Sequence, residues 1–273
     1  MSSKLAPPNP DEVMVIRNIT PNVATFSVPF ARFGKLKVGG RGTLVKLTSG
    51  NLAVFSPVAL TQSTREKISE MGGDVQYIVA LDIEHHLFIS EWAQAFPNAK
   101  IIGPEGLQEK RDQQVDERVG KERLSVIFTK DNKGSMKIDD QFDTDFDYEY
   151  VDGHGNLELV FCYKPDSVLI EADLLFNLPA IEQYSRVPES ERPSPSFMDK
   201  LFTGIQSTEG DVKWMQRFNW YLLAKDRPSY NKSIKVISFW DFTTIIPCHG
   251  ETIEGNGKEI FHKVFDRHIK SVK

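Results

Sequence analysis

The most constraining feature of this 273-residue sequence is a strand-like apolar run that ends directly in acidic and histidine side chains. Residues 75–81 read VQYIVAL, a continuous apolar run typical of a strand buried on both faces. Residues 82–86 follow without a spacer and read DIEHH. Because a strand end is rigid, ligand groups there are held in place before a metal arrives. This junction therefore predicts a metal site at the end of a buried strand.

The residue types in this segment indicate which metals it would hold. Imidazole nitrogen suits Zn or Fe, whereas carboxylate oxygen widens the choice to Mn. We expect one or two divalent ions, with Zn first and Fe or Mn as alternatives. A competing interpretation is a helix N-terminus whose acids complement the helix dipole and whose histidines are incidental.

Three later segments offer further ligands. His154 lies between two glycines in residues 152–156 (DGHGN), which let the chain turn sharply. Asp173 lies in apolar text and needs a partner, because a buried unpaired carboxylate is costly. His249 precedes Gly250 at a predicted strand end. The candidate metal ligands are therefore Asp82, Glu84, His85, His86, His154, Asp173 and His249.

Each of these later positions also has a plainer interpretation. His154 fits a hairpin turn that contains a histidine by chance. The partner of Asp173 is then a backbone N–H group or an arginine. Cys248 is expected to be buried filler rather than a ligand. His262 and His268 lie among charged residues of a predicted C-terminal helix, where we expect exposed side chains.

The remaining sequence alternates between short apolar runs and amphipathic segments. Expected strands or β-rich segments are residues 13–30, 43–47, 52–55, 75–81, 100–103, 124–128, 157–162, 168–170 and 243–247. Expected helices are residues 61–71, 87–96, 197–205, 212–224, 234–242 and 260–269. The acidic segment 139–149 is interpreted as a solvated edge hairpin.

The distribution of proline and aromatic residues predicts how the chain is divided. We expect residues 1–12 to form a flexible tail, because the three prolines there prevent regular structure. Residues 13–273 are then a single domain with a helical insert at about residues 179–232. The aromatic side chains of that insert either wall an apolar substrate pocket or form an ordinary helix core.

Composition limits the location and the partners. A net charge of −5 argues against nucleic-acid binding. Two cysteines are too few for a disulfide-held secreted scaffold. The sequence shows neither a signal-peptide pattern nor the roughly 20 apolar residues of a membrane span. We therefore expect a cytoplasmic protein that acts on a small molecule, without a nucleic-acid or membrane partner; the oligomeric state is not predicted.

The order of these sites resembles the metallo-β-lactamase superfamily. That superfamily carries His-x-His-x-Asp-His after a buried strand, then a downstream His, a bridging Asp and a late His before Gly. The text LFISEWAQAFPNAKIIGP after the paired histidines is similar to its divergent branch, the domain of unknown function 4336. The resemblance covers most of residues 20–255. It implies an α/β fold (α+β by some schemes), a four-layer αββα sandwich.

The first motif departs from the superfamily pattern, and two registers are open. In one, His86 takes the last His of the motif and His85 replaces its Asp. In the other, Asp82 and Glu84 replace the first two His, and His86 replaces the Asp. The second register keeps three side chains at alternating positions, which suits a metal site better. More carboxylate and less imidazole shifts the preference from Zn towards Fe or Mn.

The resemblance implies a metal-dependent hydrolase that uses metal-activated water. The expected substrate is small and apolar, of the ester, lactone or amide type. Asp173 and His86 are the candidate catalytic residues. One alternative is an iron-dependent oxidoreductase on the same fold, and another is a non-catalytic binding protein with a degraded metal site.

Overall fold

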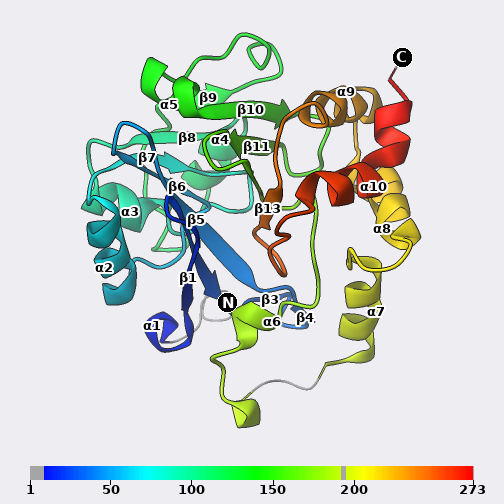
Figure 1. Cartoon of the computed structure of the whole chain (residues 1–273). Coiled ribbons are helices and arrows are strands. Elements are labelled where there is room, and N and C mark those ends of the chain that lie inside the picture. Colours follow the sequence, from blue (N-terminus) through cyan, green and yellow to red (C-terminus); the bar gives the residue numbers. More distant parts are fainter. Residues whose placement is uncertain (1–8, 192–194, 273) are drawn as a thin grey trace.

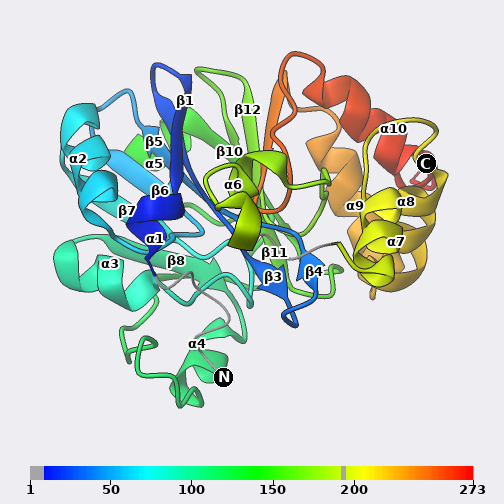
Figure 2. The same cartoon turned by 90° about the horizontal axis from the view of Figure 1, so that it is seen from below.

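The structure, a computed structural model, describes residues 9–191 and 195–272. Two β-sheets lie face to face and helices cover both outer surfaces (Figures 1 and 2). The larger sheet has the strand order β1 (Val15–Thr20), β2 (Val23–Val28), β5 (Gly40–Lys46), β6 (Leu52–Phe55), β7 (Val75–Val79), β8 (Lys100–Pro104) and β9 (Val126–Phe128). The smaller sheet has the order β10 (Phe146–Val151), β11 (Glu158–Tyr163), β12 (Val168–Glu171) and β13 (Thr244–Pro247).

Strand direction follows the connections. The β1–β2, β2–β5 and β5–β6 pairs are antiparallel. Short turns join β1 to β2 and β5 to β6, whereas a small hairpin (Ala31–Arg32 and Leu36–Lys37) lies between β2 and β5. From β6 onward the larger sheet is parallel, with α2 (Gln62–Met71) and α3 (Ile89–Ala95) in the crossovers. In the smaller sheet only the β12–β13 pair is parallel. These two strands therefore end side by side, although a long segment separates them in sequence.

The core between the sheets is built by alternation along each strand. In β6, Ala53 and Phe55 point toward the smaller sheet, while Leu52 and Val54 point toward α2 and α3. Phe55 meets Phe161 of β11 with ring centroids 5.1 Å apart. A continuous apolar strand is therefore buried on both faces, as the sequence predicted.

The outer helices complete four layers. Helices α2 and α3 cover one face, and α8 (Lys213–Phe218), α9 (Arg227–Ile237) and α10 (Gly257–Lys270) cover the opposite face (Figure 1). The predicted αββα sandwich is confirmed. The smaller elements are α1 (Pro10–Val13), β3 (Ala31–Arg32), β4 (Leu36–Lys37), α4 (Leu107–Asp112), α5 (Asp140–Asp145), α6 (Ile181–Tyr184), η2 (Glu189–Glu191), α7 (Phe197–Ile205) and the π-helical η3 (Asn219–Leu223).

Several local expectations were wrong. Residues 10–13 form one helical turn rather than part of a tail, because Pro10 occupies the first turn, where its missing N–H costs nothing; residues 1–8 lie outside the described part. The last helix before β13 begins at Arg227, not at residue 234. Its start is capped by Asp226, which accepts from the N–H of Ser229. That one domain spans residues 13–273 stays a prediction.

The acidic segment 139–149 is not a solvated hairpin. Asp139 caps α5 by accepting from the N–H of Phe142. Phe142 and Phe146 lie fully buried between the sheets, with stacked rings 4.5 Å apart. Asp140 is exposed, whereas Asp145 is buried and accepts from the N–H and hydroxyl groups of Thr48. The interleaved aromatic rings build the core, so the spacing of apolar residues determined the structure of this segment more than its charge did.

The two helical histidines differ from each other. His262 is exposed as expected, but His268 is buried. Its Nδ1 lies 2.7 Å from Oδ1 of Asn231, and its ring packs on Trp220 and Tyr230. No helix in the described ranges is long and apolar enough to cross a membrane.

Candidate metal centre

Three strands deliver their following loops to one edge of the sandwich. The chain leaves β7 at Val79, and His85 follows in a bend. The ends of β12 and β13 are paired at Glu171 and Pro247, so the residues two positions further on, Asp173 and His249, arrive together. One ligand candidate thus comes from the larger sheet and two from the smaller.

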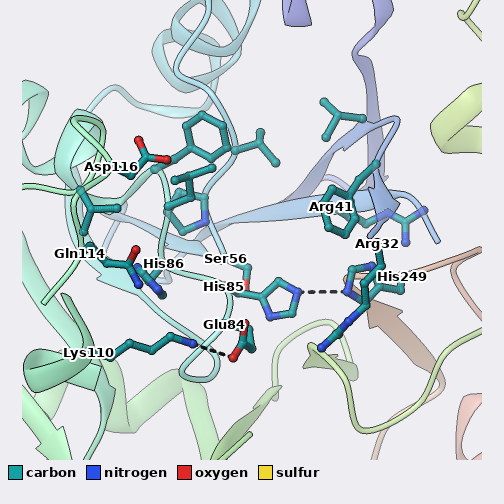
Figure 3. A pocket seen from close by; sticks show the side chains of 18 of the residues that line it. Arg32, Arg41, Ser56, Glu84, His85, His86, Lys110, Gln114, Asp116 and His249 are labelled. Carbon is teal, nitrogen blue, oxygen red and sulfur yellow. Dashed lines mark hydrogen bonds and ion pairs between the residues drawn. The ribbon is translucent and has the colours of Figure 1, made fainter. Parts of the chain in front are cut away.

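His85, Asp173 and His249 form one compact group. The Nε2 atom of His85 lies 3.1 Å from Nε2 of His249, and the latter lies 3.1 Å from Oδ1 of Asp173. One ligand atom from each residue falls within 4.8 Å of the other two. The Oδ1 atom of Asp173 is buried and accepts no hydrogen bond. Figure 3 shows the ring of His85 directed at His249.

The tautomers of both rings follow from what their other nitrogens touch. Nδ1 of His85 lies 2.9 Å from the acceptor-only carboxylate of Asp82, and Nδ1 of His249 lies 2.6 Å from the carbonyl oxygen of Gly39. Both Nδ1 atoms therefore carry the proton in a neutral ring. Two Nε2 lone pairs and the Asp173 carboxylate oxygen then face one point without a donor among them. Such a point requires a cation, either a metal ion or an additional proton.

The residues present fit a metal ion. In a tetrahedral site with ligand bonds of about 2.0–2.1 Å, neighbouring ligand atoms lie about 3.3 Å apart, close to the observed contacts. Two imidazoles and one carboxylate leave coordination positions open, as in catalytic zinc sites, and the same ligand set suits non-haem iron. The contacts of Asp82 and Gly39 are the outer partners that fix the orientation of metal-binding histidines.

Asp173 is held from two directions. Glu158 accepts from the backbone N–H groups of Ala172 and Asp173 at 2.8 and 3.0 Å. Asn156 donates to Oδ2 of Asp173 at 2.6 Å. Burial raises the pKa of Asp173, but the contact with His249 and the charge of His85 outweigh it and hold the pKa below its usual range. The carboxylate is therefore ionised and oriented before a metal arrives.

His85 has a high affinity for a proton when no metal is bound. Burial lowers its pKa, but the charge of Asp82 and the hydrogen bond to it outweigh burial and raise the pKa to about 9. A proton on Nε2 of His85 thus supplies the required cation near neutral pH. A metal ion has to displace that proton.

The other sequence candidates lie outside this group. Asp82 stands behind His85 as its hydrogen-bond partner. The side chain of Glu84 points away and pairs with Lys110 at 2.6 Å. His86 lies on the cavity wall, and burial lowers its pKa to about 4.

His154 also lies outside the group, although it is buried. Its Nδ1 accepts from the N–H of Asn156 at 3.2 Å, and its ring stacks on Tyr230. Burial lowers its pKa. Its Nε2 is buried and has no hydrogen-bond partner. The structure therefore assigns His154 no contact with the ion-binding atoms.

A backbone bend after Asp82 explains why every second residue of this segment does not point into the metal group. Oδ1 of Asp82 accepts from the N–H groups of Glu84 and His85, both at 2.7 Å. This turn ends the extended backbone, so side chains no longer alternate between two faces. The structure does not bring Asp82, Glu84 and His86, the three alternating residues of the second sequence register, together. Instead, it turns the side chain of His85 toward Asp173 and His249.

A cavity of about 370 Å³ opens above the metal group. His85 and His249 lie in its lining, and Arg32 lies on the His249 side (Figure 3). The apolar part of the lining comprises Val28, Phe30, Phe33, Pro57, Val58, Leu87, Phe88 and Val119. The aromatic residues of the 179–232 segment do not line it. Phe197, Trp214 and Tyr221 are exposed, whereas Phe202 packs on Phe176 and Phe218.

Sequence reasoning missed several residues of the site. Gly39 and Asn156 act through a backbone oxygen and an amide in loops, and no local pattern marks them. Arg32 comes from the short hairpin of β3 and β4, far from every histidine in sequence. The sequence marks this region only by two aromatic residues, Phe30 and Phe33, that precede a glycine-rich segment.

Solved structures of metallo-β-lactamases have a similar fold. The chain matches the DIM-1 metallo-β-lactamase exposed to ceftazidime with a TM-score of 0.54 and 11% identity, over 94% of this chain and 97% of that chain. It matches the mono-zinc form of the metallo-β-lactamase FIM-1 from Pseudomonas aeruginosa with a TM-score of 0.55 and 12% identity, over 99% of each. The chain thus has the metallo-β-lactamase fold, as the sequence indicated.

A family model matches part of the chain. Residues 31–107 match the model of the domain of unknown function DUF4336. A further structure with this fold is the metal-soaked Flv1 flavodiiron core from Synechocystis sp. PCC6803, with a TM-score of 0.62 and 12% identity, over 94% of this chain and 61% of that chain. No curated protein matches the sequence.

Proposed function

We propose that this protein is a metal-dependent hydrolase of a small, partly apolar substrate of the ester, lactone or amide type. His85, Asp173 and His249 would hold one divalent ion, zinc first and iron or manganese as alternatives. The observation that carries the proposal is the convergence of their three acceptor atoms beside a cavity, with both ring N–H groups already engaged. Cytoplasmic location and the absence of a nucleic-acid partner stay predictions.

The bound ion would lower the pKa of a water molecule and polarise the carbonyl group of the substrate. Asp82 and Gly39 keep both imidazole rings in the tautomer that presents Nε2. Asn156 fixes the carboxylate of Asp173. The apolar wall excludes water around the reacting group. Asp173 and His86 remain the candidate catalytic residues, because Asp173 meets the ion and the ring of His86 lies on the same cavity.

The first test is elemental mass spectrometry on protein purified without a chelator or a His-tag. We expect about one divalent ion per chain, retained in His262→Ala and lost in His249→Ala. His262 is the matched control because it is an exposed histidine on α10. The wild-type protein should then hydrolyse at least one member of a panel of small esters, lactones and amides, and His249→Ala should not.

The outcome also separates the competing functions. Iron in the native protein, together with no hydrolysis of the panel, would favour an oxidoreductase, which the two-histidine, one-carboxylate set also suits. If no preparation contains metal and none takes up added Zn, Fe or Mn, both enzyme proposals fail. A binding protein with a degraded site would then remain.

A further inference from the structure

We propose that Arg32 binds an oxyanion, a carboxylate or a phosphate, on an amphipathic substrate whose apolar part packs on the aromatic wall of the cavity. This inference rests on the proposed function, because it names the substrate class of the same site. It follows from three observations: the position of the guanidinium, its unused hydrogen-bond donors and the chemistry of the surrounding wall.

The position of Arg32 places its charge beside the metal group. Its Nη1 lies 3.8 Å from Oδ2 of Asp173, and about a third of the side chain is exposed. The guanidinium lies over the ring of the adjacent Phe33, 5.5 Å from the ring centroid, a cation–π contact that limits its freedom. Arg32 ends the short strand β3, which pairs with β4. The guanidinium thus lies in the cavity lining, next to a proposed ligand of the ion.

The donors of Arg32 are available. Across residues 9–191 and 195–272, its guanidinium donates no hydrogen bond, although it carries five N–H groups. Arg41, which also lines the cavity, is fully committed: it donates to the carbonyl oxygens of Pro247 and Gly250 and contacts Glu182. A partly exposed arginine with unused donors matches the planar geometry of a carboxylate or phosphate.

The other charged side chains of the cavity lining are held in closer ion pairs, whereas Arg32 makes only the 3.8 Å contact with Asp173 within the described residues. Lys110 pairs with Glu84 at 2.6 Å on the other side of the cavity (Figure 3). Asp116, which also lines the cavity, pairs with Arg118 at 2.8 Å. Asp173 is the nearest carboxylate to Arg32, but its Oδ2 already accepts from Asn156. Once Asp173 serves an ion, the charge of Arg32 is uncompensated.

The wall defines the rest of the ligand. Phe30, Val58, Leu87 and Phe88 line the cavity without offering polar side chains. A volume of about 370 Å³ accommodates a small molecule rather than a polymer segment. The substrate class is therefore a small amphipathic anion whose charged group lies close to the reacting bond.

Isothermal titration calorimetry of the zinc-loaded protein tests this with three matched probes: octanoate, octyl phosphate and octanamide. We expect one or both anions to bind about tenfold or more tighter than octanamide, as a charge-assisted contact implies. Arg32→Gln should lose that preference while octanamide binding is unchanged, and Arg32→Lys should keep part of it. Lys35→Gln is the control, because it removes one exposed charge from the same hairpin. The two anions tell a carboxylate from a phosphate.

The opposing results are distinct. An anion preference that survives in Arg32→Gln would assign recognition to the ion and overturn the proposal, as would equal binding of the three probes to the wild type. Zinc content is measured on every variant, so a failure of the metal site is seen separately. If the chain takes up no zinc, the same titrations on the metal-free protein still decide the role of Arg32.

Discussion

A single carboxylate oxygen determines how His85 is presented. Oδ1 of Asp82 accepts from two backbone N–H groups and lies 2.9 Å from Nδ1 of His85. It shapes the bend and fixes the ring tautomer at once. We infer that Asp82 positions His85, although the sequence suggested a ligand.

Replacing Asp82 should weaken metal binding without removing a ligand. In Asp82→Asn the acceptor is neutral, so the ring is less basic and less firmly oriented. We expect a loss of about 10–100-fold in metal affinity, the usual cost of losing an outer partner. Competition with a chromophoric chelator measures it. Unchanged affinity would show that the bend alone positions His85.

The pKa of His85, about 9 in the metal-free protein, gives a pH dependence with a defined sign. Because metal must displace the proton, apparent affinity should rise by about tenfold per pH unit up to pH 9 and then level off. The raised pKa also stabilises the metal-free fold. That contribution is complete below pH 6.5, the unfolded value, and disappears as the pH rises through about 9.

Urea unfolding of the metal-free protein at several pH values checks the second part. His85→Gln supplies the reference, and the difference in stability between the two proteins should decline from pH 6 to pH 10. A difference that does not change with pH would contradict the raised pKa.

At the scale of elements, loops after strands place the ligands, and their shape depends on close backbone contacts. Gly250 follows His249 with a φ of 85°, and a Cβ atom there would lie 2.1 Å from the carbonyl oxygen of Asn177. Gly255 has the same φ but open space around it. Comparing alanine substitutions at these two glycines therefore separates the cost of backbone strain from the cost of a steric collision.

We expect Gly255→Ala to cost about 1–2 kcal/mol, the penalty of a left-handed alanine, with metal affinity unchanged. Gly250→Ala should cost more than this and should also weaken metal binding, because the collision displaces the loop that carries His249. Thermal unfolding and chelator competition measure both effects. If the two variants have the same stability and the same metal affinity, the loop can adjust to the added methyl group without displacing His249.

The elements also show what the sequence could predict. Continuous apolar runs located β7 and the β11–β12 hairpin, because burial on two faces leaves a plain signature. The same patterns brought His85, Asp173 and His249 onto a short candidate set. The bend at Asp82, the inward turn of His268 and the reach of Arg32 depend on contacts between distant segments, so no local pattern carried them.

At the scale of the whole molecule, packing between the sheets holds the site together. Beside the metal group, the N–H of Leu159 donates to the oxygen of Leu81, and the N–H of Ile83 donates to the oxygen of Asn156. These two bonds join the sheets where the ligands emerge. The aromatic core below them, centred on Phe161, holds the two sheets at a fixed distance from each other.

Phe161→Ala should therefore affect both stability and the site. Phe161 is fully buried and its ring lies 5.1 and 5.8 Å from those of Phe55 and Phe142. We expect a loss of about 3–5 kcal/mol in unfolding free energy. Weaker metal binding should accompany it, measured as above, whereas Phe161→Leu should lose less of each. Full metal affinity in a strongly destabilised Phe161→Ala would show that the loops hold the ligands unaided.

The ligands come from both sheets, with His85 and His249 separated by 164 positions in the sequence. A bound ion therefore acts as a removable crosslink between distant parts of the chain. Closing so long a loop restricts the unfolded chain more than a local contact does. The thermal stability of this protein should accordingly follow the concentration of free metal around it, rising as the site fills.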